Sequence, residues 1–166
     1  MSPDPRSRRR QSPRGKRAVP QVRTRPSSDD PHEVVYLRRH QGDDPAQTVP
    51  GREFLNGCPV KVRATMRAVL TQVAAAPPKR FAGGGYWEAM RGEMTGWSEV
   101  RAGVPRRHHY RLFCLLDYDA MNQPKPLLAV ICGLGKPFRT TLSDADYQRV
   151  RDLGEEYRRR NPRSLA

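Results

Sequence analysis

Apolar and polar positions divide the chain into a polar first part and a patterned remainder. Residues 1–32 are Pro, Ser, Arg and other polar residues with almost no apolar side chains, whereas apolar runs recur from Glu33 onward. Such a polar segment cannot bury enough surface to offset the entropy lost on ordering. The pattern therefore predicts a disordered basic tail at 1–32, a folded domain at 33–160 and a short C-terminal tail at 161–166.

Two stretches have the spacing of amphipathic helices. Apolar side chains at intervals of three or four residues predict a helix between Pro59 and Pro77, preceded by a brief helical turn at 50–56. A second stripe follows Ser143, a candidate N-cap that would form a capping box with Asp146. The two stripes consist of Val62, Met66, Val69, Leu70 and Val73, and of Tyr147, Val150, Leu153, Gly154 and Tyr157.

Short β-rich runs make up the rest of the folded part. A first strand is predicted at 33–37, and three or four more at 86–90, 97–102, 109–117 and 127–134. Residues 127–132 are continuously apolar, as expected of a central strand covered on both faces. This order predicts an α+β fold, with an antiparallel sheet of four to five strands, an N-terminal helical hairpin and a C-terminal helix, and with the helices on one side of the sheet.

Charge adds a class of partner to this picture. The net charge is +14, and residues 1–28 hold nine Lys and Arg against one Asp, a balance of +8 that leaves +6 for residues 29–166. The folded part is therefore basic without the tail. A basic domain attracts polyanions, of which nucleic acid is the commonest, although general solubility is the simpler explanation of charge alone.

Other classes of protein are disfavoured. No run approaches the roughly 20 apolar residues that a membrane-spanning helix needs, and the basic N-terminus has no apolar run behind it, as a secretory signal would. Cys58, Cys114 and Cys132 are an odd number, and we interpret them as reduced thiols of a cytoplasmic protein. Because His and Cys do not cluster with ligand spacing, the sequence predicts no metal site, and it indicates no cofactor.

Three groups of residues carry a resemblance to one known family. Residues 53–55 with 59–64 resemble the helical hairpin of that family. Residues 97–101 and 110–113, Trp-Ser-Glu-Val-Arg and Tyr-Arg-Leu-Phe, resemble its two central strand motifs, and residues 133–140 resemble its last strand with a terminal lysine. Together these motifs resemble the RelE/ParE superfamily and are most similar to its HigB-like branch, and the resemblance covers the chain from about Val34 to Tyr157.

The resemblance implies a function and partners. Members of this family are typically toxins of type II toxin-antitoxin pairs, and many cut messenger RNA, commonly at the ribosome and without a metal. It implies mRNA, the ribosome and a cognate antitoxin, of the helix-turn-helix type, as partners of this chain. The ParE branch instead poisons DNA gyrase.

Strand alternation places several ionisable side chains on common faces. Glu99 and Arg101 share one face of their strand, and His109 and Arg111 share one face of the next. Metal-free RNA cleavage needs a base for the 2′-hydroxyl and cations for the phosphorane. Glu99 or His109 could be the base, while Arg101, Arg111 and Lys136 would hold the phosphate. Glu99 and Arg101 are as readily explained as an ion pair on an open sheet face.

Residues at the strand ends are candidates for RNA binding only. Arg106 and Arg107 lie in a turn where we expect them to steer phosphates, and Arg139 belongs to the same basic surroundings. Phe138 could stack on a base, although loop aromatics more often pack.

Three functions remain open at this point. The leading one is a ribosome-dependent endoribonuclease toxin. The second is a binding protein on the same fold, either directed at gyrase or without catalysis, and the third is a basic structural protein of a ribonucleoprotein. Basic residues at defined strand positions favour the first two.

Overall fold

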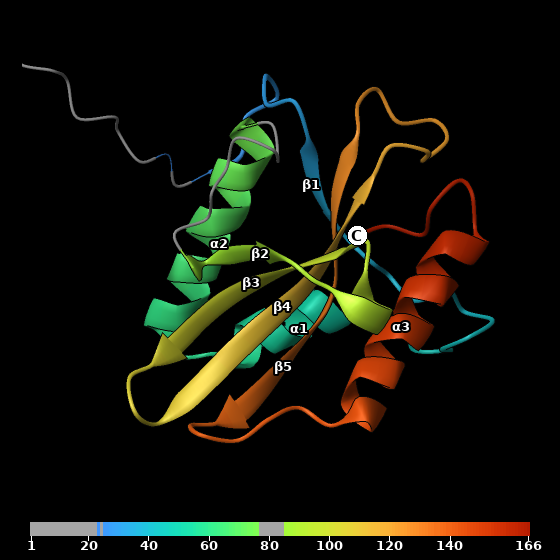
Figure 1. Ribbon diagram of the computed structural model, residues 1–166. Coiled ribbons are helices and arrows are strands. Elements are labelled where there is room, and N and C mark those ends of the chain that lie inside the picture. Colours follow the sequence, from blue (N-terminus) through green and yellow to red (C-terminus); the bar gives the residue numbers. More distant parts are fainter. Residues whose placement is uncertain (1–22, 24, 77–84) are drawn as a thin grey trace, which may run out of the picture.

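Five strands form one sheet in the order β1-β5-β4-β3-β2 (Figure 1). The computed structural model describes residues 23, 25–76 and 85–166. The strands are β1 (Glu33–Tyr36), β2 (Trp87–Ala89), β3 (Trp97–Val104), β4 (His108–Asp117) and β5 (Leu127–Pro137). The helices are α1 (Pro50–Gly57), α2 (Val60–Ala75) and α3 (Asp144–Arg159), with a 3-10 turn, η2, at Gly92–Met94.

The predicted α+β class and element order are confirmed, with one difference in strand direction. Strands β2 to β5 are antiparallel to their neighbours, but β1 pairs with β5 in parallel, with Glu33 opposite Leu127. The sheet is therefore mixed. A parallel pair needs a long crossover connection, and here every element from α1 to β4 lies between the two strands in sequence.

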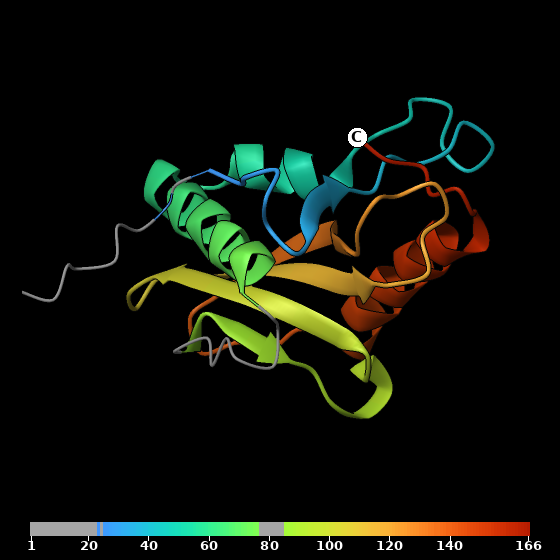
Figure 2. The ribbon, with the colours of Figure 1, turned by 90° about the horizontal axis from the view of Figure 1, so that it is seen from above.

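Helices cover both faces of the sheet, which corrects the expectation that they lie on one side. Helices α1 and α2 pack on one face and α3 on the other (Figure 2). The α1–α2 core includes Leu55, Met66, Val100, Leu112 and Val130, and the α3 core includes Trp97, Phe113, Ile131, Val150 and Tyr157. The continuously apolar β5 requires cover on both faces, because each face of it carries apolar side chains.

The ends of the two longer helices follow their local sequences. Ser143 caps α3, its side chain accepting from the Asp146 backbone N–H while the Asp146 carboxylate accepts from that of Ser143, as predicted. Pro59 is the residue before α2 and not part of its first turn, and α2 ends at Ala75.

An irregularity in β5 changes which of its side chains share a face. Phe113 of β4 faces Cys132 and Cys114 faces Val130, so Ile131 is left without a partner in a β-bulge. Ala129, Ile131 and Cys132 all pack in the α3 core. After the bulge, the even-numbered residues of β5 face the α3 side.

Hydrogen bonds attach the segment before β1, which carries no apolar pattern, to the rest of the domain. His32 donates its backbone N–H to Ala74 at 3.2 Å, and Lys125 donates to the backbone oxygens of Ser28 and Asp30 at 2.9 Å. Asp30 and His32 are buried. Ordered contacts therefore begin before Glu33, the predicted start of the domain. The apolar pattern did not indicate them, because they are hydrogen bonds. Residues 1–22 and 24 of the predicted tail lie outside the described residues.

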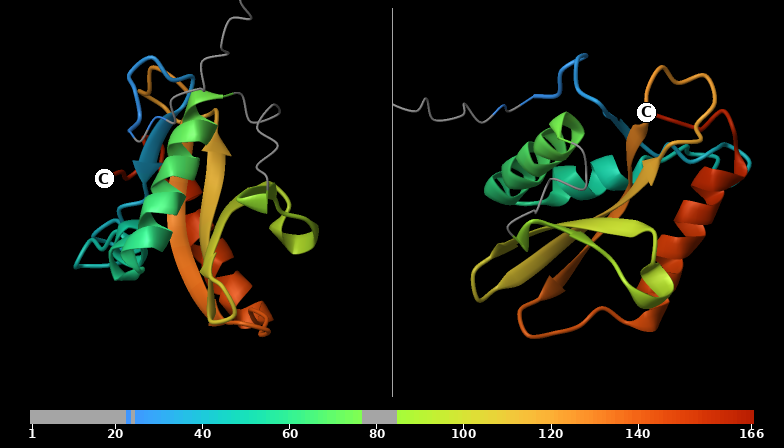
Figure 3. Two further views of the ribbon diagram at one scale, coloured as in Figure 1. Left: turned by 90° about the vertical axis from the view of Figure 1, so that its left-hand side faces the viewer. Right: turned by 45° about the horizontal axis from the view of Figure 1, so that its top comes forward.

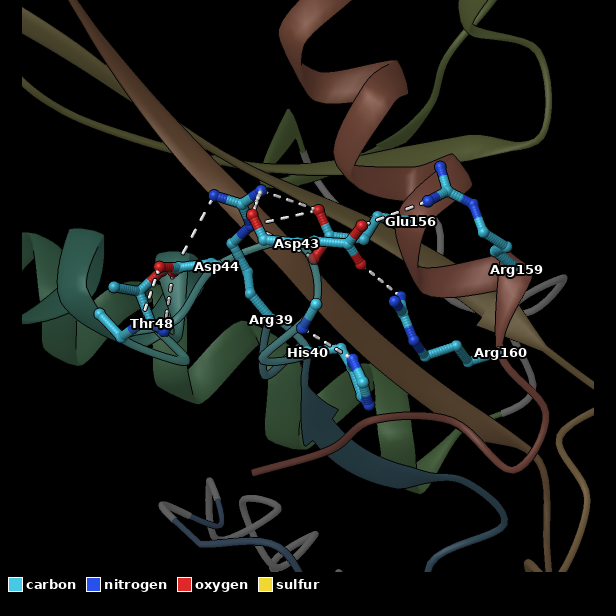
Figure 4. Close-up of polar contacts among 10 residues, drawn as sticks. Arg39, His40, Asp43, Asp44, Thr48, Glu156, Arg159 and Arg160 are labelled. Atoms are coloured by element: carbon cyan, nitrogen blue, oxygen red, sulfur yellow. Dashed lines mark hydrogen bonds and ion pairs between the residues drawn. The ribbon is translucent and has the colours of Figure 1, made fainter.

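The connection between β1 and α1 is attached to α3 by a network of ions (Figure 4). Arg39 donates to the Glu156 carboxylate at 3.0–3.2 Å, and Asp43 pairs with Arg159 and Arg160. This network ties together segments from opposite ends of the sequence.

Residues 161–166, predicted as a tail, lie against the sheet. Leu165 bridges to Leu37, and Ala166 donates its backbone N–H to Tyr36 at 2.9 Å. The Arg163 side chain, 8% exposed, pairs with the buried Asp117 at 2.7 Å, and Tyr157 donates to the same carboxylate at 2.8 Å. No helix in the described part of the chain is long and apolar enough to cross a membrane.

Candidate functional site

The face of the sheet that carries α3 also carries a group of ionisable side chains. Strands β3 and β4 extend away from α3 toward their hairpin (Figure 3). Arg101 lies opposite Arg111 across β3 and β4, and His109 lies opposite Lys136 across β4 and β5. Partners directly opposite each other share a face. The structure therefore brings together the predicted side chains of three neighbouring strands.

Lys136 reaches this face because of the bulge in β5. Counting strictly from Leu128 and Val130, which pack toward α1 and α2, the even-numbered Lys136 would face those helices. The extra residue at Ile131 reverses the alternation and puts Lys136 beside His109. Lys136 was predicted as a site residue from its place in a motif, and strand alternation alone could not give the side of the sheet on which it lies.

Glu99 lies at the centre of the group and is almost completely buried. Its side chain is 2% exposed, and it accepts from Arg101 Nε at 2.6 Å and from Arg111 Nη1 at 3.1 Å. A buried carboxylate needs such partners, since an isolated buried charge is very unfavourable. The ion pair expected as the simpler explanation is present, and it links three of the predicted site residues on two strands.

Two further residues complete the group, and the sequence analysis missed both as site residues. Glu88 on β2 lies opposite Glu99, and its carboxylate binds Arg101 Nη1 at 3.0 Å, so that Arg101 bridges two acids. Tyr147 on α3 accepts from Arg111 Nη1 at 3.4 Å through its hydroxyl. Tyr147 was predicted in the apolar stripe of its helix, and its second role depends on where α3 packs.

Two adjoining depressions lie over these residues. The first, of about 480 Å³, is lined by Tyr86, Arg101, His109, Arg111 and Lys136 among others. The second, of about 680 Å³, is lined by Glu88, Arg91, Glu99, Arg101, Arg111 and Tyr147 among others. Because Arg101 and Arg111 line both depressions, we call the two depressions together the basic trough.

The predicted RNA-binding residues lie in the β3–β4 turn and just after β5, and are linked to the basic trough through the contact of Phe138 with His109. Phe138 lies with its ring 5.5 Å from that of His109, and its backbone N–H donates to Arg107 at 3.0 Å. Arg139 lies over the Phe138 ring at 5.4 Å. Lys136 donates to the backbone oxygen of Thr140, which holds this loop against the strand. Arg106 is exposed in the turn before β4, with a positive φ of 59°.

The trough offers cations, an exposed histidine and a fixed carboxylate, but within the described residues no group of three His, Cys, Asp or Glu side chains that could hold a metal ion. Such a surface suits a phosphate ester, because guanidinium forks bind two phosphate oxygens at once.

Comparison with known proteins identifies no relative. No family model, no curated protein and no solved structure matches this chain. The resemblance to the RelE/ParE superfamily therefore rests only on its sequence motifs, at residues 53–55, 59–64, 97–101, 110–113 and 133–140.

Proposed function

We propose that the basic trough binds an RNA phosphodiester and cleaves it, and that the protein is the toxin of a type II toxin-antitoxin pair with a RelE/ParE-type, HigB-like fold. The substrate would be mRNA, reached at the ribosome in the cytoplasm. The observation that carries the proposal is the convergence of Arg101, His109, Arg111 and Lys136, from three neighbouring strands, on one open concave surface. Four cationic or titratable groups at fixed strand positions suit one phosphate.

In this proposal His109, and not the buried Glu99, accepts the proton. The Glu99 side chain is only 2% exposed and both of its oxygens already accept from guanidiniums, which makes it a poor acceptor for the proton of a substrate hydroxyl. His109 is exposed at the trough, and imidazole is the side chain that ordinarily titrates near neutral pH. His109 takes the proton of the 2′-hydroxyl as its oxygen attacks the phosphorus.

The cations of the trough stabilise the negative charge of the phosphorane. Arg101 and Arg111 are oriented in advance by Glu99, which makes Glu99 a positioning residue, and Lys136 adds a third charge. The bond from phosphorus to the 5′-oxygen breaks, and this oxygen takes a proton from water, since the trough is open to solvent. The products are a 2′,3′-cyclic phosphate and a 5′-hydroxyl end.

The experiment is induced expression of the full chain, followed by mapping of RNA 5′ ends. The proposal expects new 5′-hydroxyl ends in mRNA with the wild type and a strong reduction with His109→Ala. Unchanged RNA in cells whose growth is arrested would overturn the nuclease function. Cleavage of purified RNA with and without ribosomes then defines the substrate.

A second function on the same face has its own support. The donors of Arg101 already bind Glu88 and Glu99, which suits a stable charged surface for a macromolecule as well as a reacting site. Growth arrest with intact RNA would favour this function, and a DNA supercoiling assay would show whether gyrase is the target.

An antitoxin would act by covering the basic trough. An acidic or helical segment complements this surface, and such complexes weaken as salt screens their charges. A short adjacent reading frame that encodes a helix-turn-helix protein would support the toxin pair.

A further inference from the structure

A second concave site lies on the other side of the sheet, next to β1 and α2. It has a volume of about 410 Å³, and three arginines surround it, Arg25 from the N-terminal segment, Arg52 from α1 and Arg67 from α2. Val34, Tyr36 and Leu70 line it as well. We call it the arginine pocket. Its size is within the range of about 300–1,000 Å³ that is usual for small-ligand sites.

The arginines of this pocket have unused binding capacity. Within the described part of the chain, none of the three guanidiniums pairs with a carboxylate or donates a hydrogen bond. Arg39, Arg101, Arg111 and Arg163 are all engaged with acids. Three like charges around one depression repel each other, and an anion bound among them would remove that repulsion.

The lining next to these charges is apolar and aromatic. Val34 and Tyr36 are half-buried and Leu70 is buried against the α1–α2 core. Arg52 lies over the Tyr36 ring at 5.2 Å. Burial raises the pKa of Tyr36, while the charges of Arg67 and Arg52 oppose that rise, which places both guanidiniums within electrostatic reach of the phenol.

From this arrangement we propose that the arginine pocket binds a nucleoside phosphate, its phosphate between Arg52 and Arg67 and its base against Val34 and Leu70. A phosphate group fits better than a carboxylate for two reasons. A phosphate monoester carries up to two charges for the guanidiniums to match, and the apolar lining accepts a flat ring. The nucleotide is either free or one unit of an RNA chain. The site is separate from the basic trough, and neither proposal depends on the other.

The test follows amide NMR signals of the isotopically labelled full chain during titration with adenosine 5′-monophosphate, adenosine and inorganic phosphate. Adenosine 5′-monophosphate should move the signals of Tyr36, Leu70 and Thr71, which line the pocket, and adenosine without its phosphate should not. Arg52→Ala/Arg67→Ala should weaken binding at least about tenfold, because it removes two charge-assisted contacts.

Lys61→Ala/Arg63→Ala is the matched control, since it removes the same charge from α2 outside the pocket. It should change binding less than about twofold, as expected for long-range charge effects alone. An equal loss in both double variants, or no shift of the pocket signals with any phosphate, would overturn the proposal. Signals that move with a polyglutamate peptide but not with adenosine 5′-monophosphate would overturn it in favour of an acidic protein partner.

A second arm distinguishes the two sources of the nucleotide. An adenosine hexanucleotide is titrated into Glu99→Gln/Arg101→Ala/Arg111→Ala protein, so that the basic trough contributes little and no buried carboxylate is left without a partner. Binding more than about tenfold tighter than the mononucleotide, with the same dependence on Arg52 and Arg67, would assign the pocket to RNA, since further phosphates add contacts. Similar affinities would assign it to a free nucleotide.

Discussion

The two concave sites lie on opposite sides of one sheet, and they differ in how their arginines are held. In the basic trough, Arg101 and Arg111 are fixed by the buried Glu99. In the arginine pocket, Arg52 and Arg67 have no such carboxylate among the described residues. A guanidinium fixed before its ligand arrives loses less freedom on binding and keeps its geometry, which suits chemistry. Unpaired arginines can use all their donors on a ligand, which suits binding alone.

This difference makes Arg111 the residue with the largest expected effect. Arg111→Ala should reduce RNA cleavage on the order of a hundredfold, the scale for losing one preorganised donor. Lys61→Ala, on α2 and outside both the basic trough and the arginine pocket, should leave the cleavage rate unchanged. Cleavage assays on both purified variants, with circular dichroism to confirm folding, provide the measurement. Equal rates for Arg111→Ala and the wild type would end the catalytic account of the trough.

The role of Glu99 as an anchor predicts a loss of stability. Glu99→Gln removes the charge that two guanidiniums share, and because Arg101 and Arg111 are 40% and 21% exposed, we expect a cost of about 1–2 kcal/mol, below that of a fully buried pair. Urea unfolding measures it. The control Glu93→Gln alters an ion pair with Arg151 in which the Glu93 side chain is 82% exposed, which should change the unfolding midpoint much less. A cost no larger than in this control would mean that Glu99 does not hold the arginines.

The ion pair of Asp117 with Arg163, away from both sites, gives a reference for how strongly a carboxylate with arginine partners stabilises the fold. Burial by itself raises the pKa of Asp117, but the hydrogen bonds from Arg163 and Tyr157 outweigh it and lower that pKa. The stabilisation is therefore present above the unfolded pKa of about 3.9 and is lost as the pH falls below it. Urea unfolding between pH 7 and pH 3 should show a steeper loss in the wild type than in Asp117→Asn. Parallel curves would contradict this assignment.

The smallest expected effect concerns Glu88, whose carboxylate binds one donor of the Arg101 guanidinium. Glu88 is 45% exposed, so its pairing with Arg101 is screened by solvent. Glu88→Gln should free one side of Arg101 and strengthen RNA binding by about twofold to fivefold, within the scale of an exposed ion pair. Fluorescence anisotropy at two salt concentrations measures it, and the gain should shrink at the higher one. Weaker binding would mean that Glu88 orients Arg101 for the substrate.

Strand alternation was sufficient to predict much of the trough. Period two placed Glu99 with Arg101 and His109 with Arg111, and the antiparallel register puts these four on one face. The helical stripes and the capping box of Ser143 were equally readable, because each depends on neighbours within four residues. Local spacing was enough wherever the interaction itself is local.

The remaining features depend on contacts that are distant in sequence. The side of Lys136 follows from a bulge at Ile131, and bulges have no reliable pattern in a continuously apolar run. Glu88 and Tyr147 join the trough only because β2 pairs with β3 and α3 packs beside them. Likewise, no spacing brings Arg25, Arg52 and Arg67 around one pocket.

By itself, the sequence determined the α+β class, the order of the elements, the basic character of the domain and the parity of its strand residues. Only the tertiary structure decided the parallel pairing of β1, the cover on both faces, the burial of Glu99 and the existence of a second arginine site. The physical reason is the range of the interactions. Backbone geometry sets the direction of a side chain over a few residues, whereas burial and ion pairing depend on which segments meet when the chain folds.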